Sequence, residues 1–167
     1  MRIGYDRREA ALALALAFGL VTLAMAWMFE LLLGYVPCKL CLWQRWPYYV
    51  GLPLAVVSLL TFNHGSRVDL ARAIAGAVAL VFLVSIGLGL YHAGVEWKFW
   101  AGPADCGGRI IGGPPSVQDF RKALETARMV SCTDAPLRML GLSFAGWNAV
   151  ISAFLMALAL RATTAQR

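Results

Sequence analysis

Long apolar stretches, each interrupted by few polar residues, dominate this chain. Four of them, at about residues 10–33, 46–62, 71–91 and 142–160, are predicted to be membrane-crossing helices. At about 1.5 Å per residue, the first is long enough to cross a hydrocarbon core about 30 Å thick. The second is the shortest and contains two prolines, which neighbouring helices accommodate by satisfying the freed carbonyl groups. The pattern therefore predicts an all-α membrane protein, a four-transmembrane-helix bundle forming a single domain over residues 1–167.

Two segments connect these spans on the same side of the membrane: about residues 34–45, between the first and second spans, and about residues 92–141, between the third and fourth. The second contains a glycine- and proline-rich run, which is typical of exposed chain. After this run, Ser116 and Asp119 resemble a capping box at a helix start. Apolar residues then recur at helical spacing, which predicts a short amphipathic helix; they are Val117, Phe120, Leu124 and Ala127.

The start of the chain resembles a secretory signal peptide, because arginines precede an apolar run and Ala24-Met25-Ala26 resembles a cleavage site. The apolar run, however, continues to Leu33, well beyond the 7 to 15 residues that are usual for a signal peptide. We therefore expect the segment to be retained as the first helix.

Composition agrees with a membrane protein and excludes several other classes. Hydrophobic residues make up 60% of the chain and charged residues 14%, against about 25% charged in soluble domains. The net charge of +6 comes from dispersed basic residues without interleaved aromatics, so no nucleic-acid partner is predicted. The chain has neither a glycine-rich phosphate loop nor a haem-attachment motif, so nucleotide, flavin and haem cofactors are not expected either.

Four spans place both termini on one side of the membrane and both connecting segments on the other. Basic residues are nearly equal in number on the two sides, but on the terminal side they are concentrated in short segments that flank the spans. Because density next to the spans governs orientation, we expect cytoplasmic termini. The connecting segments would then face an oxidising compartment, where disulfides persist.

All four cysteines of the chain fall in these connecting segments. Cys38 and Cys41 form a Cys-x-x-Cys pair, and Cys106 and Cys132 form a wider pair. A Cys-x-x-Cys pair opens and closes readily as a disulfide, so two such pairs could pass electrons in series. If the chain is already helical after Cys41, Arg45 lies one turn on, on the same face, where its charge would favour a thiolate.

The cysteines also allow other interpretations. A four-cysteine zinc site usually has two short Cys-x-x-Cys knuckles, and the second pair here is far too widely spaced. Two structural disulfides are disfavoured because a Cys-x-x-Cys bond closes too small a loop to add much stability. A membrane protein that binds zinc or copper through the four thiolates, and a quinone enzyme like vitamin K epoxide reductase, stay as alternatives. In the latter, the Cys-x-x-Cys pair belongs to a late span.

Taken together, these features resemble the disulfide bond formation protein B (DsbB) family of membrane thiol:quinone oxidoreductases. The resemblance covers nearly the whole chain: four spans, the Pro37-Cys38-Lys39-Leu40-Cys41 motif, Arg45 at the same offset, and the pair Cys106 and Cys132. It implies an enzyme of the bacterial inner membrane whose cysteine segments are periplasmic. The implied partners are a periplasmic thioredoxin-like dithiol oxidase (DsbA-type), the lipid bilayer and a membrane quinone as cofactor, with ubiquinone favoured over menaquinone.

The resemblance also implies a role for each site residue. The partner oxidase would attack a Cys106–Cys132 disulfide at Cys106, and the released Cys132 would attack Cys38. Cys41 would then face the quinone, with Arg45 beside it. His92 resembles a family histidine near the quinone, and no metal is expected. No role is assigned to Gln44, Glu96 or Glu30.

Overall fold

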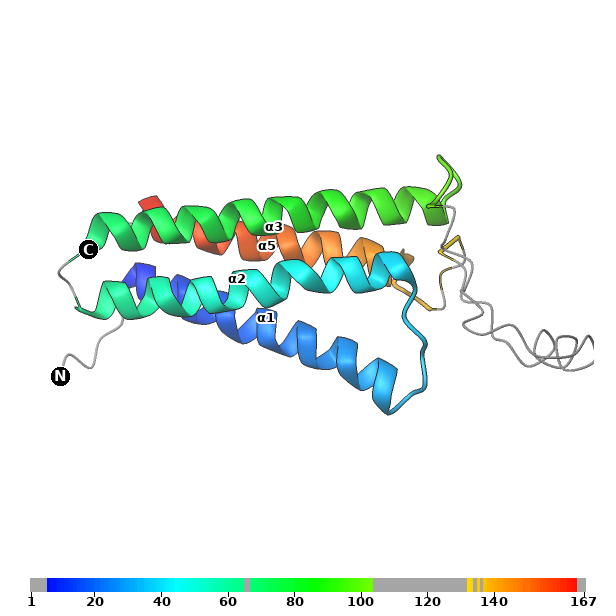
Figure 1. The fold of residues 1–167 in the computed structure, drawn as a ribbon, viewed down its shortest axis with the longest axis horizontal. Coiled ribbons are helices and arrows are strands. Elements are labelled where there is room, and N and C mark those ends of the chain that lie inside the picture. The colour runs from blue at the N-terminus through cyan, green and yellow to red at the C-terminus, as the bar shows by residue number, and fades with distance from the viewer. Residues whose placement is uncertain (1–5, 65–66, 104–131, 134, 136, 165–167) are drawn as a thin grey trace, which may run out of the picture.

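The chain folds into a bundle of helices, seen in a computed structural model that describes residues 6–64, 67–103, 132–133, 135 and 137–164. The helices are α1 (Arg7–Leu31), α2 (Lys39–His64), α3 (Val68–Glu96) and α5 (Phe144–Thr164). Two short antiparallel strands, β1 (Arg138–Met139) and β2 (Leu142–Ser143), precede α5. The helices run side by side in alternating directions, so both termini lie at one end of the bundle (Figure 1). The amphipathic helix predicted near residues 116–127 lies outside the described residues.

Three of the described helices, α1, α3 and α5, are long and apolar enough to cross a membrane. α2 is 26 residues long but is not among them. Its first two turns carry Lys39, Gln44 and Arg45, and Pro47 follows, so the apolar part of the helix is shorter than the helix itself. The fold is therefore mostly helical, as expected, with an additional pair of short strands, while the crossing by α2 stays a prediction.

Two helices extend beyond the predicted spans at the same end of the bundle. α2 begins at Lys39 rather than near residue 46, and α3 continues to Glu96 rather than ending near residue 91. Cys41 and Arg45 therefore lie on one helix, which was the condition for placing them on the same face. His92 lies inside a helix and not in the connecting segment where we expected it.

Small residues allow the helices to approach closely, which is how helices associate in a membrane, where water exerts no hydrophobic pressure between them. α3 packs against α2 and α5, and α1 packs against the same two helices. A Cβ atom added at Gly89 of α3 would lie 3.0 Å from the carbonyl oxygen of Ala145 on α5. Larger side chains fill the core between these contacts; those fully buried include Leu12, Val78, Phe82 and Leu155.

A hydrogen-bonded polar cluster lies inside the bundle and links three helices. The Ser152 hydroxyl donates to Ser85 at 2.8 Å, and the Tyr48 hydroxyl donates to the Asn148 side-chain oxygen at 2.9 Å. Polar groups in a membrane interior must find such partners, because lipid supplies none. The cluster therefore holds α2, α3 and α5 in register.

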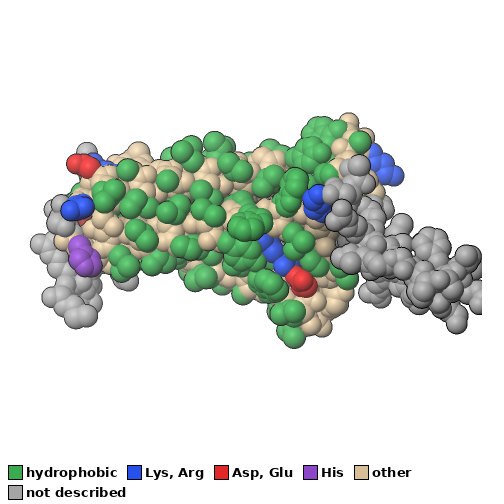
Figure 2. All heavy atoms as spheres, viewed as in Figure 1, with side chains coloured by type: hydrophobic (Ala, Val, Ile, Leu, Met, Phe, Trp, Pro, Cys, Tyr) green, Lys and Arg blue, Asp and Glu red, His purple; other side chains and the backbone are tan. Residues whose placement is uncertain are grey.

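The outer surface of the helices is apolar. In the face shown in Figure 2, hydrophobic side chains cover most of the bundle, and charged side chains lie mainly towards its two ends. Leu20, Val84 and Leu80 are each more than half exposed, at 56%, 61% and 64%. Such exposure is unusual for a soluble protein and normal for helices surrounded by lipid tails.

Candidate functional site

Cys38 and Cys41 lie at the start of α2, at the end of the bundle opposite the termini. Cys38 immediately precedes the helix, and the backbone N–H of Cys41 donates to the Cys38 sulfur at 3.1 Å. The two sulfurs are 2.6 Å apart, and both cysteines are free. The pair is thus placed to close into a disulfide. Its position at a helix N-terminus also favours a thiolate, because unpaired N–H groups point towards the sulfur.

The environment of Cys38 selects that residue as the thiolate of the reduced pair. The hydrogen bond from the Cys41 thiol lowers the pKa of Cys38 to about 5, against burial, which raises it. His92 and the backbone N–H of Cys41 lower the pKa further. Cys38 is therefore ionised at neutral pH and ready to act as a nucleophile or a metal ligand.

His92 on α3 connects this pair to two buried polar side chains. Its Nε2 atom lies 3.7 Å from the Cys38 sulfur, and its Nδ1 atom lies 2.7 Å from the side-chain nitrogen of Gln44. Because an amide nitrogen can only donate, Nδ1 accepts this bond and the ring proton of the neutral histidine is at Nε2, towards the sulfur. Glu96, one turn further along α3, has its Oε1 atom 3.9 Å from Nε2.

Gln44 and Glu96 are the site residues that sequence reasoning missed. Both are buried, with exposed fractions of 7% and 6%, and the Oε2 atom of Glu96 has no hydrogen-bond partner within the described part of the chain. Their spacing in the sequence was a usable signal. Glu96 lies four residues after His92, and Gln44 lies three residues after Cys41, so each pair shares one helix face. The sequence alone does not reveal that these faces of α2 and α3 contact each other.

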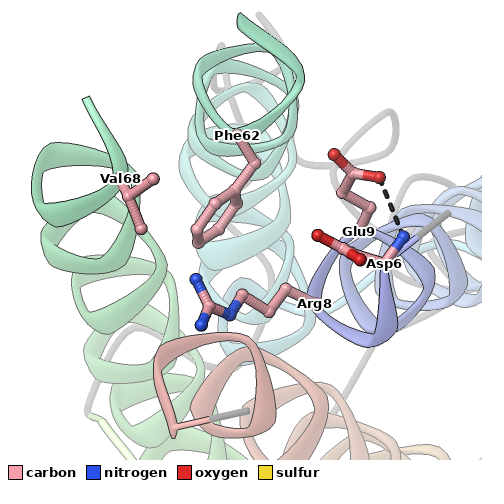
Figure 3. Close-up of a pocket in the computed structure, with 5 residues that line it drawn as sticks. All are labelled: Asp6, Arg8, Glu9, Phe62 and Val68. Carbon is pink, nitrogen blue, oxygen red and sulfur yellow. Dashed lines mark hydrogen bonds between the residues drawn. The ribbon is translucent and has the colours of Figure 1, made fainter. Parts of the chain in front are cut away.

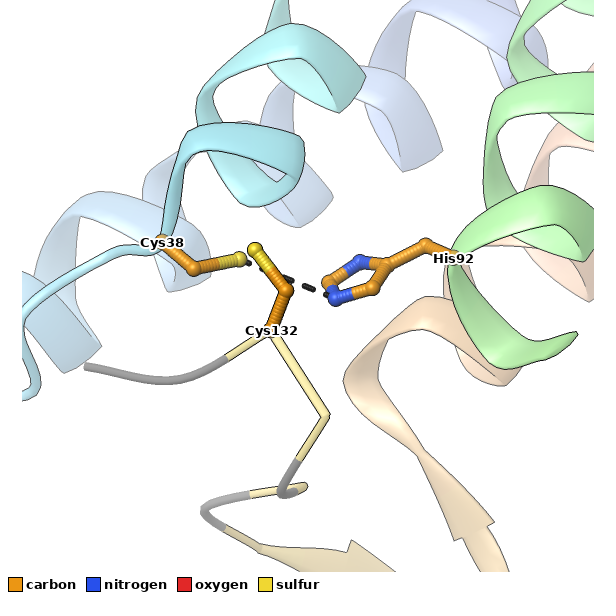
Figure 4. A group of neighbouring side chains, drawn as sticks. All are labelled: Cys38, His92 and Cys132. Atoms are coloured by element: carbon orange, nitrogen blue, oxygen red, sulfur yellow. Dashed lines mark hydrogen bonds between the residues drawn. The ribbon is translucent and has the colours of Figure 1, made fainter. Parts of the chain in front are cut away.

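Cys132 is brought to the same place from the far part of the chain. It is 2% exposed and disulfide-bonded. The ligand atoms of Cys38, His92 and Cys132 all lie within 4.8 Å of one another, and the two sulfurs face each other beside the imidazole ring (Figure 4). Cys106, the remaining predicted site residue, lies outside the described residues.

Arg45 is turned towards α1. Its guanidinium pairs with the Glu30 carboxylate, donates to the Ala26 carbonyl at 3.3 Å and stacks over the Trp27 ring at 5.1 Å. The helical spacing from Cys41 to Arg45 is as predicted, but the described contacts of the guanidinium are all with α1. Glu30 is thereby identified as the partner of Arg45.

A second depression lies at the other end of the bundle and has a different character. Its lining residues are Asp6, Arg8, Glu9, Phe62 and Val68, with the Arg8 guanidinium 5.8 Å from the Phe62 ring centroid (Figure 3). None of these side chains is a thiol or an imidazole. We therefore expect any redox chemistry at the end that holds Cys38, His92 and Cys132.

Comparison with known proteins identifies the family of the chain. The chain matches the family described as disulfide bond formation protein DsbB over residues 7–162. A disulfide bond formation protein B of Marinobacter nauticus is 34% identical over 157 residues, covering 86% of this chain and 88% of the relative. A second, from Xanthomonas oryzae pv. oryzae, is 32% identical over 136 residues, covering 77% of this chain and 74% of the relative. No solved structure was found to match the chain.

Proposed function

The chain belongs to the disulfide bond formation protein B family, and from this premise we propose that it oxidises a periplasmic DsbA-type dithiol oxidase and reduces a membrane quinone. Family membership and the apolar helices identify a bacterial membrane protein of disulfide formation. The observation that supports the electron route is the meeting of Cys38 with Cys132 beside His92, from segments far apart in the chain.

The route consists of thiol–disulfide exchanges, each an attack by a thiolate on a disulfide sulfur. A thiolate of the partner attacks Cys106 in a Cys106–Cys132 disulfide, which forms a mixed disulfide and releases the Cys132 thiolate. Cys132 then attacks Cys38 in the Cys38–Cys41 disulfide, which forms a Cys38–Cys132 bond and releases the Cys41 thiolate. The short path between the Cys132 and Cys38 sulfurs supports this second step.

The two original disulfides, Cys106–Cys132 and Cys38–Cys41, are then restored. The second thiol of the partner displaces Cys106, so the partner leaves as a disulfide. Cys106 attacks Cys132 and frees Cys38, which re-forms its bond with Cys41 as two electrons pass to the acceptor. A quinone, when bound, would supply the chemistry for this last step as the acceptor of two electrons and two protons, so that one dithiol would be oxidised for each quinone reduced.

The residues near Cys41 fit a quinone headgroup. Arg45 lies one turn after Cys41 and has a fork of N–H donors suited to a carbonyl oxygen. Trp27 of α1 offers an aromatic face beside this guanidinium. α1 also leans away from α2 towards its Leu31 end (Figure 1), on the side from which an apolar ligand would approach out of the bilayer. Arg45 and Trp27 would hold the ring, with Cys41 as the electron donor.

We further propose a location in the inner membrane, with four crossings, cytoplasmic termini and periplasmic cysteines. The alternating helices support this arrangement, because they place the Cys38 end of α2 and the His92 end of α3 together, opposite the termini. In that orientation the cysteines can meet a periplasmic partner.

The test is quinone reduction by the detergent-purified protein, mixed with a reduced DsbA-type oxidase and a short-chain ubiquinone. Quinone absorbance is followed for the wild type, Cys41→Ser and Cys106→Ser. Reduction that needs both cysteines would support the relay, and repeating it with a menaquinone analogue would define the acceptor. If no quinone were reduced by the wild type, the proposed function would be wrong.

A further inference from the structure

We propose that the fully reduced protein has a binding site for one thiophilic metal ion, with Cys38, His92 and Cys132 as ligands and Zn²⁺ as the ion that fits them. The three residues come from the start of α2, the last turns of α3 and the segment before β1. All three are buried, at 6%, 3% and 2% exposure. Two thiolates and one imidazole form a ligand set that Zn²⁺ prefers.

The distances between the ligand atoms agree with tetrahedral coordination. With Zn–S bonds of about 2.3 Å and Zn–N bonds of about 2.0–2.1 Å, two bound sulfurs lie about 3.8 Å apart and a sulfur and nitrogen about 3.6 Å apart. The Cys38 sulfur and His92 Nε2 are 3.7 Å apart, and all three ligand atoms lie within 4.8 Å of one another. Small side-chain movements would therefore bring the three ligand atoms to the separations that one bound ion requires.

Gln44 can support the histidine in the metal-bound state. Binding through Nε2 requires the ring proton to move to Nδ1, which must then donate to an acceptor. The Gln44 amide lies 2.7 Å from Nδ1, and rotating it presents its oxygen there in place of its nitrogen. The same side chain thus serves both tautomers of His92.

Glu96 provides an independent sign that a cation belongs here. Its carboxyl group is buried and its Oε2 atom finds no hydrogen-bond partner among the described residues, while Oε1 lies 3.9 Å from His92 Nε2. A buried carboxylate without a partner is costly, and a bound cation offsets that cost. Glu96 is not one of the three clustered ligands, so we assign it the role of balancing the charge of the ion from beside His92.

The redox state of the cysteines controls this site. Cys132 is disulfide-bonded in the present structure, so its sulfur becomes a ligand only after reduction. Closing the Cys38–Cys41 bond would likewise remove the Cys38 thiolate. The ion should therefore bind the fully reduced protein and leave on oxidation. If the proposed function holds, the ion also blocks turnover, because it binds the sulfurs that must exchange.

Cobalt provides a direct readout, since Co²⁺ occupies zinc sites and gives a thiolate-to-metal absorption band. The full chain is reduced in detergent, freed of reductant under anaerobic conditions and titrated with Co²⁺. We expect one Co²⁺ per chain, displaced by Zn²⁺, and no band with the oxidised protein. Because neither partner nor quinone is present, this result is separate from the test of the proposed function.

Variants distinguish this site from simple chelation by the Cys-x-x-Cys pair. Cys132→Ser and His92→Ala should abolish the band, Glu96→Gln should weaken binding about tenfold or more, and Cys41→Ser should retain it. His64→Ala is the matched control, because His64 is the other histidine of the chain and lies exposed at the far end of α2. Circular dichroism verifies that each variant is folded.

Two results would overturn the proposal. One is an absent band in the reduced wild type. The other is a band that persists in folded Cys132→Ser and His92→Ala but disappears in Cys41→Ser, which would place the ion on the Cys38 and Cys41 pair alone. Quinone reduction measured with a chelator present could succeed in either case, so the proposed electron route would survive the loss of the metal site.

Discussion

At the scale of single residues, reactivity depends on which sulfur of the first pair holds the negative charge. In the reduced pair the Cys41 thiol and His92 stabilise a thiolate at Cys38, which is also the sulfur that faces Cys132. In the proposed relay, a Cys38 that is bonded to Cys132 could no longer carry charge, and Cys41 would be left as the free thiolate. The order of the proposed exchanges would thus follow from the group that each sulfur contacts.

The lowered pKa of Cys38 predicts a thiolate that persists in acid. Its pKa falls from 9.0 to about 5, so the thiolate should be present above about pH 5 and lost as the pH falls through that value. Cys41→Ala removes the largest cause of the lowering and should shift the midpoint upward more than His92→Ala does. Near-ultraviolet thiolate absorbance of the reduced protein, titrated with pH, measures the midpoint.

The control for this titration is His64→Ala, which leaves the environment of Cys38 unchanged and should titrate like the wild type. A midpoint near that of an ordinary thiol in the wild type would contradict the prediction. So would a larger shift in His92→Ala than in Cys41→Ala.

At the scale of the elements, apolar length predicted where the helices lie but not where they end. The four apolar runs correspond to α1, α2, α3 and α5. The first turns of α2 and the last turn of α3 contain polar residues that only tertiary contacts make favourable, because Gln44 binds His92 and Arg45 binds Glu30. Such pairing between helices leaves no periodic signal in the chain, so the site was predicted through its cysteines and not through their neighbours.

The pair of Glu30 and Arg45 ties the splayed end of α1 to α2, and its loss should loosen this end. Both side chains are largely buried, at 27% and 11% exposure, so Glu30→Gln would leave the guanidinium without its counter-charge. We expect a loss of about 1–3 kcal/mol in the free energy of unfolding, between the values for exposed and buried pairs. Denaturant unfolding in detergent, followed by circular dichroism, measures this loss.

A matched control is available at the other end of the bundle. Asp69 and Arg72 form an exposed pair on α3, 3.8 Å apart, and Asp69→Asn should leave stability unchanged because solvent screens the pair. Equal stability of Glu30→Gln and the wild type would show that Arg45 does not depend on Glu30, and that the contact contributes nothing to holding α1.

At the scale of the whole molecule, the position of α2 decides the topology. Among the described helices, α1, α3 and α5 alone qualify as spans by length and composition, and three crossings would put the termini on opposite sides of the membrane. Yet α2 runs alongside α3 for its full length, burying Leu52, Ala55 and Phe62 and presenting Val57 and Leu60 outward. Its polar residues lower its mean hydropathy, but Gln44 and Arg45 are already paired within the bundle. The cost of placing them in a membrane is therefore reduced.

We therefore predict four crossings, with both termini in the cytoplasm. Green fluorescent protein fused after Arg167 should fluoresce, and alkaline phosphatase fused after Pro103 should be active, because the first folds in the cytoplasm and the second requires an oxidising compartment. Alkaline phosphatase fused after His64, between α2 and α3, should be inactive. Alkaline phosphatase activity at that position would mean that α2 fails to cross. The two cysteine pairs would then lie on opposite sides of the membrane, and only one of them could meet the proposed partner.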